Sequence, residues 1–203
     1  MLRDKIMAGD LAPCEKLTET NLAGRLNISR GPLREAILQL TEEGLLVKEA
    51  YRGLRVRSVS RRELSELYSM RTTLERFAIE ESWDKRTDAA LDILRRRLIR
   101  LEQARTAKDV SAAVDGEIAL HSWIYELSGH SLLKSHWQKL VPLVQIYMSI
   151  HNRQHGVTGV FMDANHKYVD LMQGDDRAAI LNHIGEHMQK GLDSVYASVE
   201  ADR

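Results

Sequence analysis

The spacing of apolar residues changes at Gly44, and this change limits the folds that the first part of the chain can adopt. Before this glycine, four apolar residues follow the i, i+3, i+4, i+7 spacing of an amphipathic helix: Leu33, Ala36, Ile37 and Leu40. After it, apolar and polar residues alternate around 45–47 and 54–57, which predicts a β-hairpin with its turn at 51–53. A helix followed directly by a short hairpin indicates a small unit with a β-wing.

A second, shorter helix is predicted just before this one. Thr18 is placed to cap its N-terminus, and the helix is expected to end near Asn27 after the loop at 11–17. Ser29 is the N-cap candidate of the longer helix, and Pro32 falls in its first turn, where the missing backbone N–H costs little. Two helices joined by a turn of about three residues form a helix-turn-helix.

Two arginines stand at the start of the longer helix. Arg30 and Arg34 are four residues apart, so both side chains project from one face of its N-terminal turns. This arrangement is typical of a helix that enters the major groove of DNA, where arginine pairs with guanine. The wing tip, Arg52 and Gly53, is placed to approach the minor groove. The alternative is that the two helical arginines form an ordinary solvated face.

The charge distribution along the chain favours DNA binding by the first part. The whole chain is neutral, with 29 basic and 29 acidic residues. Residues 1–62, however, carry twelve basic and eight acidic side chains, whereas residues 63–203 carry seventeen and twenty-one. The excess positive charge therefore lies where contact with DNA phosphates would require it.

The remainder of the chain is predicted to be an all-helical bundle of about six or seven helices. We therefore expect a mainly α protein with two domains, a winged helix-turn-helix at 1–60 and a helical domain at 61–203. In the first bundle helix, Arg71 interrupts an otherwise apolar seam. Two interpretations remain open for it: a buried ion pair, for example with Glu75, or a guanidinium that lines a cavity and holds a carboxylate.

The expected compartment is the cytoplasm. Cys14 is the only cysteine, so an intramolecular disulfide and a multi-cysteine metal site within one chain are both excluded. We find neither an apolar run long enough to span a bilayer nor a secretory signal pattern, and we expect no association with a membrane.

All eight histidines lie after residue 120. Glu117 and His121 are spaced i, i+4, which stacks a carboxylate and an imidazole on one helix face. His166 is expected at the head of a later helix, and His183 and His187 lie one turn apart on the last one. Three neutral imidazoles and one carboxylate would suit Zn²⁺, Ni²⁺ or a similar divalent ion. The alternative is a set of ordinary polar histidines.

The first part of the chain closely resembles the signature of the GntR family of bacterial transcription regulators. The resemblance rests on the segment ISRGPLREAILQLTEEGLL, with Ala23 and Leu17 upstream and Cys14 in place of the usual glycine. It implies that Arg30 and Arg34 read bases or phosphates of DNA. It also implies that three further residues lie near the DNA backbone: Ser29, Gly31 and Thr20.

The second part resembles the FCD sensor domain of the FadR subfamily. The segments ELYSMRTTLE, EIALHSWIYELSGHSLL and NHKYVDLMQGDDRAAILNHIGEHM carry this resemblance. The metal-binding version of that domain implies four ligands here: Glu117, His121, His166 and His187, with His183 as a substitute for the last. Glu117 stands where the family has aspartate, and His130 stands where it has asparagine.

These features together predict a transcriptional regulator without enzymatic activity. We expect a homodimer that binds a palindromic operator in double-stranded DNA and is controlled by a small carboxylate bound at the metal, with Arg71 or His130 holding its other end. One alternative is a regulator for which the metal ion is itself the signal. A second is a metal-dependent enzyme that carries a DNA-binding appendage, with Glu117 as a base.

Overall fold

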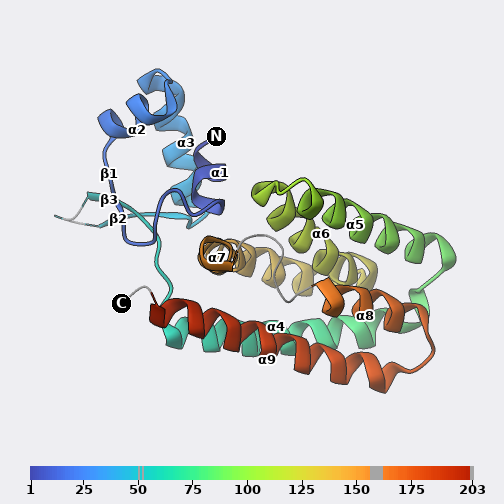
Figure 1. Cartoon of the computed structure of the whole chain (residues 1–203). Helices are drawn as coiled ribbons and strands as arrows, with labels where there is room; N and C mark the ends of the chain where they lie inside the picture. The colour runs from blue at the N-terminus through green and yellow to red at the C-terminus, as the bar shows by residue number, and fades with distance from the viewer. Residues whose placement is uncertain (50, 52, 156–161, 202–203) are drawn as a thin grey trace.

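A computed structural model describes residues 1–49, 51, 53–155 and 162–201. It places a small N-terminal unit with a sheet beside a larger bundle of helices (Figure 1). The predicted mainly α architecture, with a small β-wing near the N-terminus and an all-helical second part, is confirmed. No helix in the described part of the chain is both long enough and apolar enough to cross a bilayer.

The N-terminal unit begins with three helices. Their bounds are α1 (Leu2–Met7), α2 (Glu19–Leu26) and α3 (Arg30–Glu42). Thr18 caps α2 as predicted, because its hydroxyl accepts a hydrogen bond from the backbone N–H of Asn21 at 3.2 Å. The helix ends at Asn27, whose left-handed backbone (φ 51°) stops further helical turns. Ser29 occupies the N-cap position of α3, but its side chain makes no capping hydrogen bond among the described residues.

The wing is a three-stranded antiparallel sheet. Its strands are β1 (Lys16–Leu17), β2 (Leu46–Glu49) and β3 (Gly53–Val56), in the order β1-β3-β2. In the register of β2 on β3, Leu46 faces Val56 and Glu49 faces Gly53. The prediction of a plain loop at 11–17 was wrong at its end, because two residues are too few to show an alternating pattern and Leu17 is a strand partner of Leu54.

The described residues of the helical unit form six α-helices and one short 3-10 helix. They are α4 (Arg61–Ser82), the 3-10 helix (Trp83–Lys85), α5 (Asp88–Thr106), α6 (Val110–Ser128), α7 (Ser131–His155), α8 (Met162–Gln173) and α9 (Arg177–Ala201). Helices α4 and α9 run side by side, and α5 packs along α6 (Figure 1). Helix α6 also contacts α4 and α7, so it lies at the centre of the bundle.

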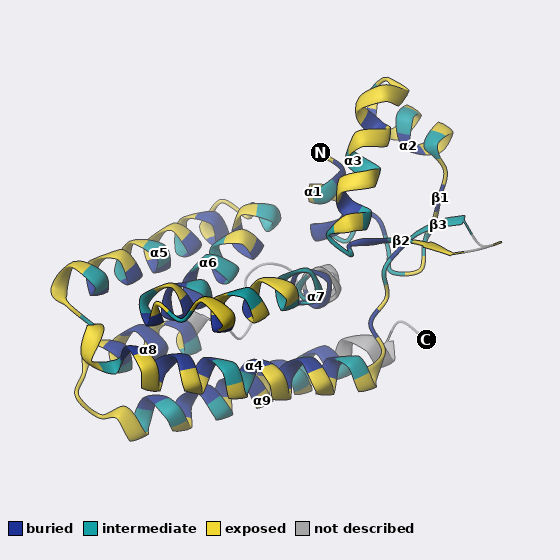
Figure 2. Cartoon of the chain, turned by 180° about the vertical axis from the view of Figure 1, so that it is seen from behind, coloured by how far each residue is buried: buried dark blue, intermediate teal, exposed yellow. Residues whose placement is uncertain are grey.

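Apolar stripes hold the bundle together. The predicted seam of α5 is buried at all four positions: Leu91, Leu94, Leu98 and Leu101. Along α4, Leu64, Leu67 and Ala78 are buried, and so is the arginine that interrupts them, Arg71. Figure 2 shows the same pattern, with buried residues on the inner faces of the helices and exposed residues outside. Burial of these side chains supplies the main driving force for folding.

The two units meet where α1 packs against α6 and α7. The hydroxyl of Ser111, in the first turn of α6, donates a hydrogen bond to Asp4 of α1 at 2.9 Å. Arg3 forms an ion pair with Glu43 at the end of α3 and contacts the side chain of Gln145 on α7 at 3.5 Å. Helix α1 therefore links the winged unit directly to the bundle.

Candidate functional site

The start of α3 is exposed on the surface of the winged unit. Arg30 and Arg34 are both exposed in its first turns, and the guanidinium Nε of Arg34 lies 2.8 Å from Oε2 of Glu19 on α2. The other residues expected near the DNA backbone in this region are exposed as well: Thr20, Ser29 and Gly31. Gly53 begins β3 with φ 79°, a backbone conformation that favours glycine, whereas Arg52 lies outside the described residues.

Sequence reasoning missed one residue on this face. Leu38 is 61% exposed and follows Arg30 and Arg34 at the i, i+4, i+8 spacing of one helix face. The spacing was available in the sequence, but an apolar residue two positions before Leu40 is not distinguished by its type from the buried residues of the same helix. An exposed leucine beside two arginines presents an apolar surface of the kind that contacts thymine methyl groups.

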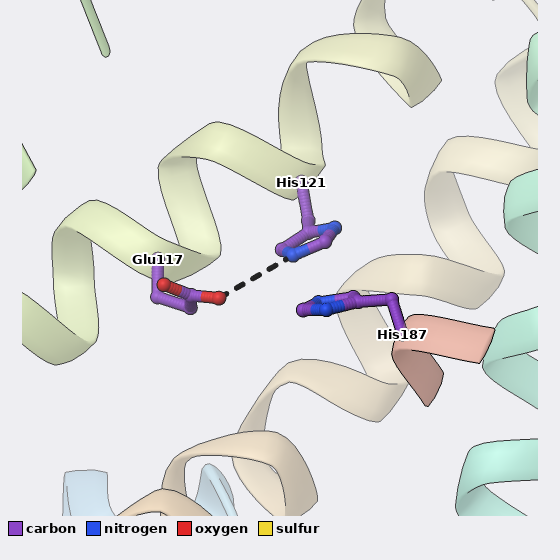
Figure 3. A group of neighbouring side chains, drawn as sticks. All are labelled: Glu117, His121 and His187. Atoms are coloured by element: carbon purple, nitrogen blue, oxygen red, sulfur yellow. Dashed lines mark ion pairs between the residues drawn. The ribbon is translucent and has the colours of Figure 1, made fainter. Parts of the chain in front are cut away.

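The second candidate site lies inside the helical unit. Glu117 and His121 project from successive turns of α6, and His187 of α9 lies against them (Figure 3). Each offers one ligand atom, and these atoms lie within 4.8 Å of one another. All three side chains are buried, and the rings of His121 and His187 stack with their centroids 5.4 Å apart.

Glu117 is held by groups from two further helices. Its Oε2 accepts a hydrogen bond from Arg105 of α5 at 2.9 Å and another from the amide of Asn165 of α8 at 2.7 Å. Burial alone would raise the pKa of Glu117, but the hydrogen bond and charge of His121, together with the charge of Arg105, lower this pKa to about 2. Glu117 is therefore a carboxylate at neutral pH.

The pKa values of the two imidazoles are shifted in opposite directions. Burial would lower the pKa of His121, but the charge of Glu75 and hydrogen bonds with Glu117 and Glu75 raise it to about 9. The ring contacts Oε1 of Glu75 through Nδ1 at 2.5 Å and Oε1 of Glu117 through Nε2 at 3.4 Å. Burial and the neighbouring His121 lower the pKa of His187 to about 3, so its imidazole is neutral.

Arg71 is completely enclosed next to this group. Its Nη1 donates a hydrogen bond to the hydroxyl of Tyr147 at 2.6 Å, and its Nη2 lies 3.9 Å from Oε2 of Glu75. The guanidinium also lies over the ring of Trp137, 5.3 Å from its centroid. The ion pair with Glu75, one of the two interpretations of this arginine, is thus present, although the distance between its charged atoms is long.

Three expected ligand or effector residues are not members of this group. His166 is exposed, and its Nε2 lies 2.5 Å from Oε1 of Glu102, so it does not join Glu117 and His121. His183 points its Nε2 at the backbone carbonyl of Ala164, 2.9 Å away. His130 precedes α7, where its Nδ1 accepts a hydrogen bond from the backbone N–H of Leu133, as an N-cap residue does.

The placement of His166 has a simple geometric cause. The buried stripe of α8 consists of Tyr168, Val169 and Met172, and it extends backwards at helical spacing to position 165. Asn165, which is 0% exposed, therefore enters the site, and the next side chain, that of His166, points away from it. The apolar stripe was the signal in the sequence that could have located Asn165.

Arg105 also escaped the sequence analysis. It continues the buried seam of α5, because it follows Leu101 by four residues and Leu98 by seven. The residue type gave no indication of burial, because arginine is mostly exposed in folded proteins. The helical spacing nevertheless places its side chain on the inner face, where it reaches Glu117.

The donor set of this group fits a divalent ion. Imidazole nitrogens and a carboxylate oxygen are ligands of Zn²⁺ and related ions, and ligands about 2.1 Å from one ion lie at most about 4.2 Å apart. The three ligand atoms lie within 4.8 Å of one another, about 0.6 Å beyond this value, so the side chains would draw slightly closer around one ion. Oδ1 of Asn165 is buried and makes no hydrogen bond to any described residue, and Nε2 of His121 has only the long contact of 3.4 Å with Glu117. Such unsatisfied atoms are typical of a site that receives a ligand.

A pocket opens beside the group. It has a volume of about 220 Å³ and lies between α8 and α9, where His187 and His183 form part of its wall. Lys167 and Lys190 line it together with Asp163 and Glu186. Its volume is below the range of about 300–1,000 Å³ that is common for drug-sized ligands, so the pocket suits a small molecule.

Comparison with protein families divides the chain in the same way as its fold. Residues 1–56 match the family of bacterial regulatory proteins called the gntR family, and residues 66–190 match the FCD domain. The uncharacterised transcriptional regulator YdhC of Bacillus subtilis is 34% identical over 103 residues, which cover 51% of this chain and 46% of YdhC. The chain thus matches about half the length of that relative.

Other relatives match over nearly the whole chain. The gluconate operon transcriptional repressor of Bacillus licheniformis is 24% identical, with 98% of this chain and 82% of the repressor covered. The solved structure of McbR/YncC from Escherichia coli has the same fold, with a TM-score of 0.70, 23% identity and coverage of 97% and 93% of the two chains. The chain therefore belongs to the GntR family of bacterial regulatory proteins and carries an FCD domain behind its winged helix.

Proposed function

We propose that this protein is a transcriptional regulator that binds a DNA operator through α3 and its wing. The observation that carries this proposal is the exposure of Arg30 and Arg34 on one face of the first turns of α3. Arginines at this place reach base edges and phosphates when a recognition helix enters the major groove. The names of the relatives, transcriptional regulators and repressors, support the same function.

The proposal extends to the remaining DNA contacts and to the assembly. Thr20, Ser29 and Gly31 border α3 and would contact the DNA backbone, while Arg52 and Gly53 would place the wing tip in the minor groove. The unit at 1–60 would bind DNA, and the unit at 61–203 would dimerise and sense a ligand. A twofold homodimer would then recognise a palindromic operator.

Operator binding can be tested by fluorescence anisotropy with DNA from upstream of the protein's own gene. Replacing Arg30 and Arg34 together by alanine should weaken specific binding by about 1–3 kcal/mol per arginine. The matched control is Arg96→Ala with Arg100→Ala, because these two arginines are also exposed but belong to α5. Equal affinities of the two double variants at the same salt concentration would show that Arg30 and Arg34 of α3 do not recognise the operator.

We further propose that Glu117, His121 and His187 hold a divalent ion, Zn²⁺ or Ni²⁺, and that a small carboxylate bound there controls DNA binding. The ion would supply a positive charge that attracts the acid. Asn165 offers an additional amide oxygen, and the guanidinium groups of Arg71 and Arg105 offer N–H donors for a carboxylate. The two nitrogen ligands and one carboxylate favour these ions over Mg²⁺ or Ca²⁺, which prefer oxygen.

A second candidate is a regulator for which the metal alone is the signal, because the same three side chains would serve it. The two functions differ in which ligand is needed for the full change in operator affinity. If metal added to chelator-treated protein changes operator affinity fully without any organic acid, the ion is the signal. If a further change follows the acid, the acid is the effector.

A further inference from the structure

The wing carries one fully exposed tyrosine. Tyr51 lies in the turn between β2 and β3, and its side chain is open to solvent. Of the other five tyrosines, four are buried and one is partly buried: Tyr68, Tyr125, Tyr147, Tyr168 and Tyr196. A single exposed aromatic residue is common on protein surfaces, so the exposure of Tyr51 alone indicates no function.

The backbone of Tyr51 is a second and independent observation. Its φ is 62°, in the left-handed region, where a bulky side chain is disfavoured. Glycine adopts this conformation freely and asparagine adopts it readily, so the stability of the hairpin alone would favour either of them at this position. The fold therefore does not explain a tyrosine that is strained and also exposed. Strain of this kind is typical of a residue whose side chain serves a function.

The strands beside Tyr51 form a positively charged surface. They carry three cations and one carboxylate: Lys16, Lys48, Arg55 and Glu49. Lys16 is exposed, and its Cε lies 3.8 Å from the position that a Cβ on Gly53 would occupy, so it lies alongside the end of the hairpin. The net positive charge of this surface attracts the phosphates of a nucleic acid.

One face of the sheet presents Lys16 to solvent. Lys16 and Arg55 are directly opposite each other in the register of β1 on β3, so their side chains share a face. Nη1 of Arg55 donates a hydrogen bond to the backbone carbonyl of Cys14 at 2.7 Å, which ties this guanidinium to the loop before β1. The ammonium group of Lys16 is therefore the cation of this face that can reach a phosphate.

The chain connects this face to the proposed DNA contacts of α2. Strand β1 continues through the N-cap residue Thr18 into α2, where Thr20 is proposed to contact the DNA backbone. Strands β2 and β3 project away from the helical bundle (Figure 1). In a complex with DNA, Lys16 would thus lie between the helix-turn-helix in the major groove and the wing in the minor groove.

We propose that Tyr51 packs its ring against the sugars of the operator's minor groove and that Lys16 binds a phosphate at the edge of this groove. The inference rests on the proposed DNA binding by the winged unit and names two residues through which the wing binds. An aromatic ring in the minor groove removes water from the deoxyribose walls, and the neighbouring ammonium neutralises a phosphate. Glycine at position 51 would keep the turn without making this contact.

The contribution of Tyr51 is tested with variants that suit the left-handed backbone but lack the ring. The probe is a DNA duplex that the wild-type protein selects from a random pool, and its affinity is measured by fluorescence anisotropy at fixed salt. Tyr51→Gly and Tyr51→Asn should each raise the melting temperature of the protein and yet weaken DNA binding by about fivefold or more. Tyr51→Phe keeps the ring and should retain the wild-type affinity within about twofold.

Hydroxyl-radical footprinting locates the contact, because these radicals attack the deoxyribose from the minor groove. The wild-type protein and Tyr51→Phe should protect sugars next to the segment contacted by α3. Tyr51→Asn should lose this protection and keep the protection that α3 provides. A purely structural role of Tyr51 would not produce a more stable protein with a shorter footprint.

The contribution of Lys16 is tested by the salt dependence of binding. Each phosphate contact contributes about 0.9 to the slope of log affinity against log salt concentration, so Lys16→Gln should reduce that slope by about this amount. Lys139→Gln is the matched control, because Lys139 is an exposed lysine of α7 in the helical unit. The Tyr51 variants should leave the slope unchanged, since tyrosine carries no charge to neutralise a phosphate.

The outcomes separate this inference from the proposed function. Wild-type affinity and a wild-type footprint in both Tyr51→Gly and Tyr51→Asn would overturn the minor-groove contact and leave DNA binding through α3 standing. A changed oligomeric state of these variants in light scattering, with unchanged DNA affinity, would assign Tyr51 to a protein contact and overturn it as well. An unchanged salt slope in Lys16→Gln would overturn the phosphate contact. Failure of the wild-type protein to select any duplex would overturn both the inference and the proposed function.

Discussion

Nδ1 of His121 lies 2.5 Å from Oε1 of Glu75, and both side chains are almost completely buried. This contact uses one nitrogen of the ring and turns the other, Nε2, toward Glu117. Carboxylates that hold a metal-binding histidine in this way fix the orientation of the ring and increase its basicity. Glu75 is thus a positioning residue for the candidate metal centre.

Replacing Glu75 by glutamine should lower zinc affinity by about ten- to a hundredfold, because the amide positions the imidazole of His121 without increasing its basicity. The measurement is a competition titration against a zinc-binding dye. Glu80→Gln is the control, since Glu80 is an exposed acid on the same helix. Equal zinc affinity of wild type and Glu75→Gln would show that Glu75 does not orient a ligand.

Replacing Asn165 by histidine should raise zinc affinity by about tenfold or more, because a third imidazole would then face Glu117 and His121 from α8. His166→Asn should leave zinc affinity unchanged, because the ring of His166 points toward Glu102. The two variants can be compared in the same dye competition. A large loss of zinc affinity in His166→Asn would show that His166 is a ligand, and it would contradict the finding that Asn165 rather than His166 points into the site.

Glu19 should restrain DNA binding. Its carboxylate pairs with Arg34 at 2.8 Å, and DNA must compete with it for the guanidinium. The pair is exposed, so Glu19→Gln should strengthen operator binding by up to about 1 kcal/mol, or about fivefold. Anisotropy titrations at fixed salt measure this effect, with Glu42→Gln at the far end of α3 as the control. Weaker binding by Glu19→Gln would indicate that the pair instead presents Arg34 to DNA.

The start of α4 should lose stability in acid. The backbone N–H and the hydroxyl of Ser60 donate hydrogen bonds to Glu63, and with Arg57 they lower the pKa of Glu63 below its usual 4.5. A lowered pKa in the folded state means that the ionised carboxylate stabilises the fold above about pH 4.5. This stabilisation is lost as the pH falls through the folded-state value.

Glu63→Gln keeps the shape of this capping box but removes the charge. Because the carboxylate of Glu63 is partly exposed, the variant's free energy of unfolding at pH 7 should be lower than that of wild type by less than about 1 kcal/mol. The difference from wild type should shrink at pH 3, where wild-type Glu63 also begins to lose its charge. Urea denaturation at both pH values measures it. A difference of the same size at both would exclude ionisation of Glu63 as its cause.

The fold was predictable because its signals are local. The Thr18 cap, the change of apolar spacing at Gly44 and the leucine seam of α5 each depend on residues within a few turns of one another. Even the left-handed backbone of Cys14, at φ 64°, agrees with the glycine expected there by family resemblance. Strand β1 was missed, since its pairing with β3 connects residues about forty positions apart.

The buried site was predictable only in part. Glu117 and His121 are neighbours on one helix, so their spacing was sufficient to bring them together. Asn165 and Arg105 reach Glu117 from other helices, and a shift of one residue, as at His166, changes which side chain points inward. His130 caps α7 through Nδ1, a role that the sequence analysis did not predict for it.

We propose that an ion and a small acid, bound at Glu117, His121 and His187, control operator binding. The direct test is the operator affinity of one chelator-treated sample measured without additions, with Zn²⁺, and with Zn²⁺ plus each of several small carboxylic acids. We expect at least one acid in the last condition to change operator affinity by about fivefold or more, and we expect His121→Ala to abolish the change while still binding DNA. The same operator affinity of the wild-type protein in all of these conditions would overturn the proposal.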